Sequence, residues 1–438
     1  SEFLEQNKVT EVIWSIQSLK GASFYRAGDL CIESNLQFHR VPNIKEWIGG
    51  NLSSQQIKKV KIEDLLNRSV ISLENENLQS LIKGKVVLVT GAAGSIGSEL
   101  CRQILFYQPA KLVMLDNAET PMNDLFLELK ATSNGLDNLI CAIGDVTREN
   151  RVEEIFENYK PEIVFHAAAY KHVPMMEINA KEAVKVNVEG TRIVAENAIK
   201  NDTKKFILIS TDKAVNPTNV MGASKRMAEI MAQAMAQVPG FEKPMEVVTT
   251  RFGNVLGSSG SVIPLFKRQL ESGGPITVTH PEITRYFMTI PEACQLVLEA
   301  ATMGQGGEIY VFDMGEPVKI ADLAHQMVRL SGLQPGKDIA IKYTGLRPGE
   351  KLYEELLAGD ENTLPTHHPK ILVARVRSSS YDQASDALGE LRDALHSGDD
   401  YRLVSTLKKH IPEYISNNSR FNHLDKEQAR SSSLTPNT

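Results

Sequence analysis

Short apolar segments alternate with amphipathic stretches over residues 86–250, and this alternation constrains the fold more than any other feature of the sequence. The segments are rich in Val, Ile, Leu and Phe, as expected for strands buried on both faces of a parallel sheet. Strands that alternate with helices form right-handed βαβ units, so we predict an α/β fold with a doubly wound parallel sheet of the Rossmann type. The strand candidates are Val86–Thr90, Leu112–Leu115, Leu139–Ile143, Ile163–His166, Phe206–Ile209 and Val247–Thr250.

Three regularly spaced glycines follow the first strand candidate. Gly91-x-x-Gly94-x-x-Gly97 leads into a predicted helix, where glycines permit a tight turn and let a pyrophosphate approach the backbone. Asp116 ends the next strand candidate, and a carboxylate there accepts hydrogen bonds from adenosine ribose hydroxyls and repels a 2′-phosphate. Because no Arg follows Asp116 directly, we predict NAD as the cofactor and disfavour NADP.

A polar cluster follows the strand candidate at 206–209. Thr211-Asp212-Lys213 places a hydroxyl, an acid and an amine where ligands bind in an open α/β sheet. Lys225 has the spacing of a Tyr-x-x-x-Lys pair, but Met221 stands where the Tyr would be, and a thioether cannot exchange protons. Two interpretations stay open: a cofactor-binding regulator without activity, or an enzyme whose proton transfers fall to Thr211-Asp212-Lys213.

Polar and basic residues in later loops predict a second nucleotide. Guanidinium groups match phosphate in a bidentate manner, and a carboxylate can accept hydrogen bonds from ribose hydroxyls. The predicted substrate-binding residues are Lys171, Lys213, Asn254, Ser258, Arg285, Arg347 and Glu350.

Composition narrows the function classes. The net charge of -6 argues against binding to nucleic acid through the global field. The four cysteines include no CxxC pair, so we expect neither a disulfide framework nor a metal site. No apolar run approaches the length of a membrane span.

We expect four regions along the chain. An N-terminal α/β segment covers residues 1–82, with a helix near 5–19, and the cofactor-binding Rossmann domain covers 83–256. A smaller, mixed α/β substrate-binding domain covers 257–416, with small parts that return to the Rossmann domain. Residues 417–438 are polar and lack periodicity, which predicts a disordered tail.

Five stretches together resemble the extended short-chain dehydrogenases/reductases that act on nucleotide sugars, and more narrowly the bacterial UDP-N-acetylglucosamine 4,6-dehydratases. They span about residues 83–369 and read VTGAAGSIGSE, HAAAYKHVPMME, ISTDKAVNPTNVMGASK, RFGNVLGSSGSVIPLF and LRPGEKLYEE. Met in place of Tyr is similar to the larger members, which follow a transmembrane region and an extra N-terminal domain.

The resemblance implies which residues bind the cofactor and which react. It implies catalytic roles for Thr211, Asp212, Lys213, Met221 (in place of Tyr) and Lys225. NAD takes a hydride from C4 of the sugar, Lys213 as a neutral base takes the C5 proton, protonated Asp212 gives a proton to the departing C6 hydroxyl, and the hydride returns to C6. Thr211 is expected to hydrogen-bond the C4 oxygen, and either Lys213 or Thr211 via water would take the C4 hydroxyl proton. The expected cofactor-binding residues are Gly91, Gly94, Ser95, Ile96, Gly97, Asp116, Asn117, Asp145, Val146, Ala167, Ala168, Ala169, Lys171, Asn187 and Lys225.

The resemblance also implies a setting. We expect UDP-N-acetylglucosamine as substrate, retention at C5, a role in polysaccharide or glycan biosynthesis and a homo-oligomer. The chain as given is expected to be soluble, while the whole protein would be tethered by a region upstream to the cytoplasmic face of the bacterial inner membrane. A UDP-sugar 4-epimerase is the main catalytic alternative; it needs no acid–base pair for C6.

Overall fold

The computed structural model describes residues 9–16, 22–34, 36–41, 58–59, 76–132, 138–238, 244–357, 362–376 and 379–425. The chain divides into two compact units. The sheet unit comprises Ser72–Asn254, Ile290–Gly315 and Leu346–Thr438, and the smaller unit comprises Ser1–Ile71, Val255–Thr289 and Glu316–Gly345.

A nine-stranded sheet organises the sheet unit, and its strand order confirms the predicted doubly wound topology. From β9 to β6 all neighbours are parallel, whereas β18 runs antiparallel to both β14 and β17. In spatial order the strands are β17 (Asn362–Pro365), β18 (Ile371–Arg375), β14 (Glu308–Phe312), β9 (Glu246–Arg251), β8 (Lys205–Ile209), β7 (Ile163–His166), β4 (Val86–Thr90), β5 (Lys111–Asp116) and β6 (Leu139–Ile143).

The chain reverses its direction across the sheet between β4 and β7. It runs outward from β4 through β5 to β6, and then returns to build β7, β8 and β9 on the other side of β4. The central strands are buried on both faces, with the pattern BBBB over the whole of β7. In such sheets the crevice beyond the carboxyl ends of the strands at the reversal is where ligands bind.

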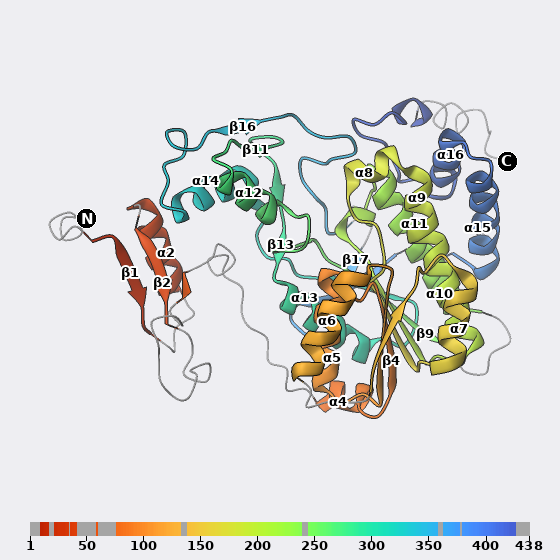
Figure 1. Ribbon diagram of the computed structural model, residues 1–438. Helices are drawn as coiled ribbons and strands as arrows, with labels where there is room; N and C mark the ends of the chain where they lie inside the picture. The colour runs from red at the N-terminus through yellow and green to blue at the C-terminus, as the bar shows by residue number, and fades with distance from the viewer. Residues whose placement is uncertain are drawn as a thin grey trace. The chain divides into compact units, whose positions relative to one another are not determined.

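Helices cover both faces of this sheet (Figure 1). One face carries α4 (Glu76–Ile82), α5 (Ser95–Phe106), α6 (Glu119–Thr132) and α13 (Ile290–Met303). The other carries α7 (Glu149–Tyr159), α10 (Thr191–Lys200) and α11 (Val220–Met235), with α8 (Val173–Ile178), α9 (Ala180–Val184) and a π-helical turn at Lys185–Gly190 beside them. No helix in the described part of the chain has the length and apolarity that a membrane span requires.

A helical hairpin near the C-terminus covers α11. The hairpin consists of α15 (Tyr381–His396) and α16 (Asp400–His410), and the apolar side chains of both join the core cluster of α11. All residues of α11 are buried as a result. The sheet unit therefore extends beyond the predicted Rossmann domain and takes up 290–315 and 346–425, which the sequence suggested only for small parts.

Residues 417–425 differ from the predicted disordered tail. Phe421 and Leu424 are buried in the core of the sheet unit, and the predicted tail residues 426–438 lie outside the described residues. Two apolar side chains are enough to anchor this otherwise polar segment, and its polar composition therefore predicts disorder wrongly.

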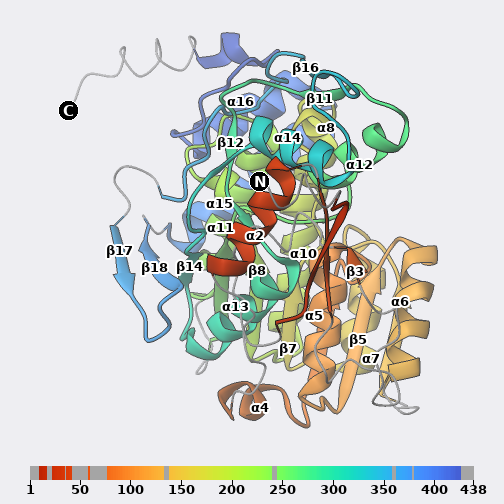
Figure 2. The ribbon, with the colours of Figure 1, turned by 90° about the vertical axis from the view of Figure 1, so that its left-hand side faces the viewer.

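The smaller unit is built from short strands. Its elements are β1 (Glu11–Trp14), α2 (Ala22–Glu33), β2 (Gln37–Arg40), β3 (Lys58–Lys59), α12 (Val262–Glu271), β11 (Ile276–Val278), β12 (Thr284–Arg285), β13 (Phe287–Met288), β15 (Val318–Lys319), α14 (Ile320–Leu330) and β16 (Ile341–Tyr343), and β10 (Asn254–Val255) lies where the chain passes between the units. Figure 2 shows α2, α12 and α14 of this unit. The helix predicted near residues 5–19 is wrong within the described residues 9–16: Val12, Ile13 and Trp14 form strand β1, which pairs in parallel with β2, as suits β-branched and aromatic residues. Residues 5–8 and 17–19 of that prediction lie outside the described residues.

Candidate active site

The turn between β4 and α5 is shaped so that only glycine fits at two of its positions. A Cβ on Gly91, whose φ is +65°, would lie 2.6 Å from the backbone nitrogen of Ala168 at the end of β7. A Cβ on Gly97 would lie 2.0 Å from the carbonyl oxygen of Gly91. The helix begins after Gly94 without a side-chain cap, so its first N–H groups face outward as donors for an anion. The predicted residues Ser95 and Ile96 form this first turn.

Two carboxylates border the turn. Asp116 accepts hydrogen bonds from the N–H of Ala93 at 3.0 Å and of Ala118 at 2.9 Å, and so fixes the turn to the end of β5. Each carboxylate oxygen retains a lone pair for a further donor such as a ribose hydroxyl. Burial by itself would raise the pKa of Asp145, but hydrogen bonds from Thr147 and Asn117 hold that pKa below its usual value. Both acids are therefore suited to accept hydrogen bonds at this edge, with the predicted Val146 buried beside them.

A buried histidine connects the ends of β4 and β7. Thr90 Oγ1 lies 2.7 Å from His166 Nδ1, and His166 Nε2 lies 3.0 Å from Thr191 Oγ1. Thr191 donates its proton to the carbonyl of Asn187, so it must accept from Nε2, and the imidazole is neutral with its proton on Nε2. Burial and the nearby Lys225 lower the pKa of His166 to about 3, which keeps it neutral.

Asn187 holds the segment that follows β7. It lies in the π-helical turn, a rare geometry that is frequent at functional sites. Its Oδ1 accepts from the N–H of Tyr170 at 2.8 Å, and its amide donates to the carbonyl of Tyr170 at 3.0 Å and to Ser224 Oγ at 2.9 Å. Both amide hydrogens are thus used within the protein. Asn187 fixes the backbone at Tyr170, and its contact with a cofactor stays a prediction.

Thr211, Asp212 and Lys213 form one hydrogen-bonded cluster at the carboxyl end of β8. Thr211 donates to Asp212 Oδ1 at 2.9 Å, and Lys213 Nζ donates to the same oxygen at 2.9 Å. Lys213 Nζ also donates to Asn254 Oδ1 at 3.1 Å, and it lies 3.7 Å from Glu354 Oε1. Asp212 is buried, and its Oδ2 has no hydrogen-bond partner among the residues that the structure describes. The Thr211 hydroxyl and the Lys213 amine thus both donate to one carboxylate oxygen of Asp212.

Met221 and Lys225 lie on the first two turns of α11, the helix that packs against the segment Asp212–Ala214. Met221 is 2 % exposed and packs in the hydrophobic core, so its thioether is a packing group. Lys225 Nζ donates to the carbonyl of Ile209 at 2.7 Å. Burial lowers the pKa of Lys225 to about 8, against the opposing influence of Glu229.

A buried ion-pair network, which the sequence does not predict, joins α11 to the carboxyl ends of β8 and β9. Glu229 accepts from Ser210 Oγ at 2.6 Å and from Arg251 Nε and Nη2 at 2.9 and 2.7 Å. Burial would raise the pKa of Glu229, but Arg251 and Arg226 lower it to about 2. The only sequence signal was a set of charged residues in an otherwise apolar helix and strand.

The loop that carries Arg347 and Glu350 is tied down from two sides. Arg347 Nη2 lies 3.2 Å from Glu350 Oε1, and the backbone N–H of Arg347 donates to Glu350 Oε2 at 3.0 Å. Thr218 and Asn219 donate to the carbonyl of Gly349 at 3.1 and 3.0 Å. The side chain of Arg347 remains 55 % exposed and is available to a ligand.

Residues 415–421, which we name the C-terminal strap, hold the same loop. The N–H of Gly349 donates to the carbonyl of Asn417 at 2.9 Å, and the amide of Asn417 donates to the carbonyl of Glu350 at 3.2 Å. Buried Glu177 accepts from Ser419 Oγ of the strap and from the N–H of Val220 at the start of α11. The strap thus joins the loop to the helix that carries Lys225.

Positive charge gathers beside this loop. Burial lowers the pKa of His172, and so do the nearby Lys171 and Arg347. Lys171 and Arg347 are therefore close to one imidazole, although they come from distant segments. A pair of cations at this place fits a diphosphate.

Two predicted residues belong to the smaller unit. Ser258 Oγ donates to the carbonyl of Val255 at 3.0 Å, and Arg285 Nη1 donates to the carbonyl of Thr284 at 2.7 Å. Both are mostly buried. Their part in substrate binding stays a prediction.

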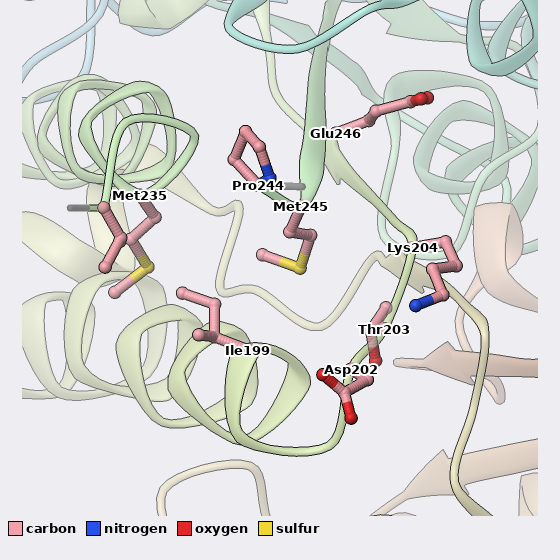
Figure 3. Close-up of a pocket in the computed structure, with 9 residues that line it drawn as sticks. Ile199, Asp202, Thr203, Lys204, Met235, Pro244, Met245 and Glu246 are labelled. Atoms are coloured by element: carbon pink, nitrogen blue, oxygen red, sulfur yellow. The ribbon is translucent and has the colours of Figure 1, made fainter. Parts of the chain in front are cut away.

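A separate cavity lies at the amino ends of the strands, away from the residues described above (Figure 3). Lys204 and Glu246 line it at the amino ends of β8 and β9, together with Ile199, Asp202, Thr203, Met235, Val238, Pro244 and Met245. Ligands of this fold bind at the carboxyl ends of the strands, and the cavity holds none of the predicted residues.

Comparison with known sequences places these features in context. The model of a family described as "Polysaccharide biosynthesis protein" matches residues 87–376. The chain is 47% identical over 82% of its length to the capsular polysaccharide biosynthesis protein CapD of Staphylococcus aureus, and it spans 59% of that protein. It is 31% identical over 73% of its length to a UDP-N-acetylglucosamine 4,6-dehydratase (inverting) of Campylobacter jejuni, of which it covers 93%. It is also 36% identical over 63% of its length to the UDP-glucose 4-epimerase of Rickettsia canadensis, of which it covers 79%.

Solved structures confirm the fold. Pen from Bacillus thuringiensis matches with a TM-score of 0.62 and 32% identity, over 68% of this chain and 91% of that one. DesIV, a dTDP-glucose 4,6-dehydratase from Streptomyces venezuelae solved with NAD, matches with a TM-score of 0.54 and 23% identity, over 62% of this chain and 87% of that one. The predicted resemblance to extended dehydrogenases/reductases and 4,6-dehydratases is thereby confirmed.

Proposed function

We propose, since the chain belongs to the polysaccharide biosynthesis protein family, that it catalyses the NAD-dependent 4,6-dehydration of UDP-N-acetylglucosamine to a UDP-4-keto-6-deoxy-N-acetylhexosamine. The observation that carries this proposal is the cluster in which Thr211 and Lys213 share Oδ1 of buried Asp212. A 4,6-dehydration needs both an acid and a base at neighbouring sugar carbons, and this cluster supplies both within 2.9 Å. The proposal includes a role in making a cell-surface polysaccharide.

The turn between β4 and α5 fits a dinucleotide. Its two obligatory glycines let the turn close tightly on the end of β7 and on the start of α5, and Asp116 and Asp145 offer oxygens to an adenosine. When bound there, NAD would accept the C4 hydrogen of the sugar with its electron pair and return it to C6. Lys225 and the backbone of Ala167–Ala169 would hold the nicotinamide half.

The proton transfers form a closed cycle through Asp212 and Lys213. Neutral Lys213 takes the C4 hydroxyl proton and passes it to Asp212 Oδ1, 2.9 Å away. Lys213 is then free to take the C5 proton, while Asp212 protonates the departing C6 hydroxyl as water. Lys213 finally returns its proton to C5, with retention of configuration. Both groups end as they began, and Thr211 supports the C4 oxygen.

This cycle removes the need for a phenol at position 221. Met221 lies in the core and has no exchangeable proton, whereas Lys213 already has a proton acceptor at hydrogen-bond distance. Lys171 and Arg347 would bind the diphosphate of the substrate, and Glu350 its ribose. Asn254, which accepts from Lys213, completes the proposed contacts in the sheet unit.

Turnover in deuterated water tests the proposal directly. UDP-N-acetylglucosamine should lose one water, as mass spectrometry reports, and NMR should show a 4-keto-6-deoxy sugar with deuterium at C5. The Lys213→Met variant should lose about 10²–10⁴-fold in turnover, since it lacks the base. Exposed Lys204, at the opposite edge of the sheet, offers Lys204→Met as a matched control.

Two other outcomes would replace the proposal. A product of unchanged mass would indicate the 4-epimerase, a reaction that needs no acid for C6. Binding of NAD and UDP-N-acetylglucosamine without any product would indicate a regulator.

A further inference from the structure

Lys213 is surrounded by more negative charge than the dehydration cycle requires. Asp212 Oδ1 lies at 2.9 Å from its Nζ, and Glu354 Oε1 lies at 3.7 Å from the same atom. Both carboxylates are almost completely buried, with exposed side-chain fractions of 1% and 4%, and the Lys213 side chain is 15% exposed. Water therefore screens these charges weakly.

The second carboxylate comes from a distant part of the chain. Glu354 follows the loop that carries Arg347 and Glu350, and no role was predicted for it. Its neighbour Glu355 is half-exposed and pairs with Lys351 at 3.0 Å, so it belongs to the surface of the same segment. Only Glu354 of these two acids faces the cluster.

Two buried carboxylates around one amine favour its charged form. An opposite charge within about 4–6 Å shifts an ionisation by roughly one to three pH units. The resting cluster therefore holds Lys213 as an ammonium ion. Before Lys213 can accept the C4 hydroxyl proton, it must release one proton to solvent.

We infer that Glu354 is a positioning residue, which holds the Lys213 side chain toward Asn254 and Asp212 and sets the pH at which Lys213 becomes a base. The part about catalysis rests on the proposed function; the part about the charge state of Lys213 does not. The charged groups with a described contact to Nζ include Asp212 and Glu354, and the neutral amide of Asn254 accepts a hydrogen bond from Nζ as well. Lys351 lies near the cluster as well, since its Nζ donates to the carbonyl of Val215 at 3.1 Å.

Competitive acetylation tests the charge state without any turnover. Full-length protein is treated with a trace of acetic anhydride between pH 6 and 11, and mass spectrometry follows the peptide that contains Lys213. The midpoint for Lys213 should move to lower pH by about one unit or more in Glu354→Gln, because one counter-ion is gone. In the matched control Glu355→Gln it should stay at the wild-type value. An unchanged midpoint in Glu354→Gln would overturn the inference.

A double variant separates charge from folding. Asn254→Asp combined with Glu354→Gln restores a carboxylate beside Nζ, and the midpoint should move back toward higher pH. If it does not, charge at Nζ is not what Glu354 supplies, and the inference fails. Bound NAD and the melting temperature, measured on each variant, report whether the fold is intact.

The pH dependence of turnover tests the catalytic part. In Glu354→Gln the acidic limb of kcat should move to lower pH together with the acetylation midpoint. A purely structural role would instead lower kcat at every pH and leave the limb in place, which would overturn this part. If the wild type makes no dehydrated product, the proposed function fails, while the acetylation result still decides the role of Glu354 toward Lys213.

Discussion

The glycine turn after β4 and the Lys213 cluster after β8 both lie at the carboxyl ends of strands of one sheet, but they are built in different ways. The turn is made of backbone from consecutive residues, closed by Asp116, which lies 23 residues from its partner Ala93. The cluster is made of side chains, and its members Lys213, Asn254 and Glu354 come from three distant segments. A site built from local backbone therefore leaves a complete motif in the sequence, whereas a site assembled from distant side chains leaves only parts of one.

Gly97→Ala, a substitution in the glycine turn, should have the strongest consequence of all. Gly97→Ala places a Cβ 2.0 Å from the carbonyl oxygen of Gly91, a contact that no side-chain movement can relieve. We expect the loss of bound NAD and of detectable turnover, measured by cofactor content after purification and by titration calorimetry.

A second glycine provides the control. Gly389 lies inside α15, and a Cβ there meets nothing within 4 Å. Gly389→Ala should keep its NAD and raise the free energy of unfolding by about 0.5–1 kcal/mol, the usual gain for such a change in a helix. Full NAD binding by Gly97→Ala would contradict the close-packed turn.

A medium effect concerns His166, which joins Thr90, just before the glycine turn, to Thr191 of α10. The pKa of His166 is about 3 in the folded protein, because burial and Lys225 lower it, against 6.5 for a free histidine. Below pH 6.5 the unfolded chain therefore binds a proton that the folded chain does not. This group should lower the stability by about 1.4 kcal/mol per pH unit as the pH falls from 6.5 toward 3. Urea titrations at pH 7, 6 and 5 should show a steeper loss of stability for wild type than for His166→Gln. Parallel curves would mean that His166 is protonated in the fold.

The smallest effect concerns the side chains that hold the loop with Arg347 and Glu350. Asn417→Ala removes the hydrogen bond to the carbonyl of Glu350 and leaves the Lys213 cluster untouched. One such bond contributes about 1 kcal/mol, so KM for the nucleotide sugar should rise by about fivefold while kcat stays within twofold. A fall in kcat at constant KM would instead tie the strap to the chemical step. Exposed Asn422, whose side chain accepts from Ser419, serves as the comparison.

How far the sequence predicts this molecule follows the same division. The parallel sheet, the glycine turn and Asp116 follow from local patterns, because the apolar segments, the amphipathic stretches and the glycine spacing can each be recognised within a short stretch of sequence. Thr211, Asp212 and Lys213 were found because they are adjacent in the sequence. Glu229, Arg251 and Glu354 were missed, because the sequence does not tell which charged residues become buried partners.

Errors at the two ends of the chain have a physical reason as well. Residues 417–425 are polar on average, and the buried side chains of Phe421 and Leu424 outweigh that average. Residues 11–14 form a strand because β2 offers a parallel partner, which no local helical pattern reveals. Tertiary contacts override local preference in both cases.

The C-terminal strap also sets the order in which the site is completed during synthesis. Asn417 reaches the loop 67 residues before it, at Glu350, and that loop in turn binds Thr218, 131 residues before Gly349. Domains generally fold as units while the chain emerges, with N-terminal parts first. The glycine turn and the strap belong to the same sheet unit, so this unit has all its parts only after residues 415–421 have emerged. A chain that stalls before these residues would lack the contacts that hold the loop with Arg347 in place.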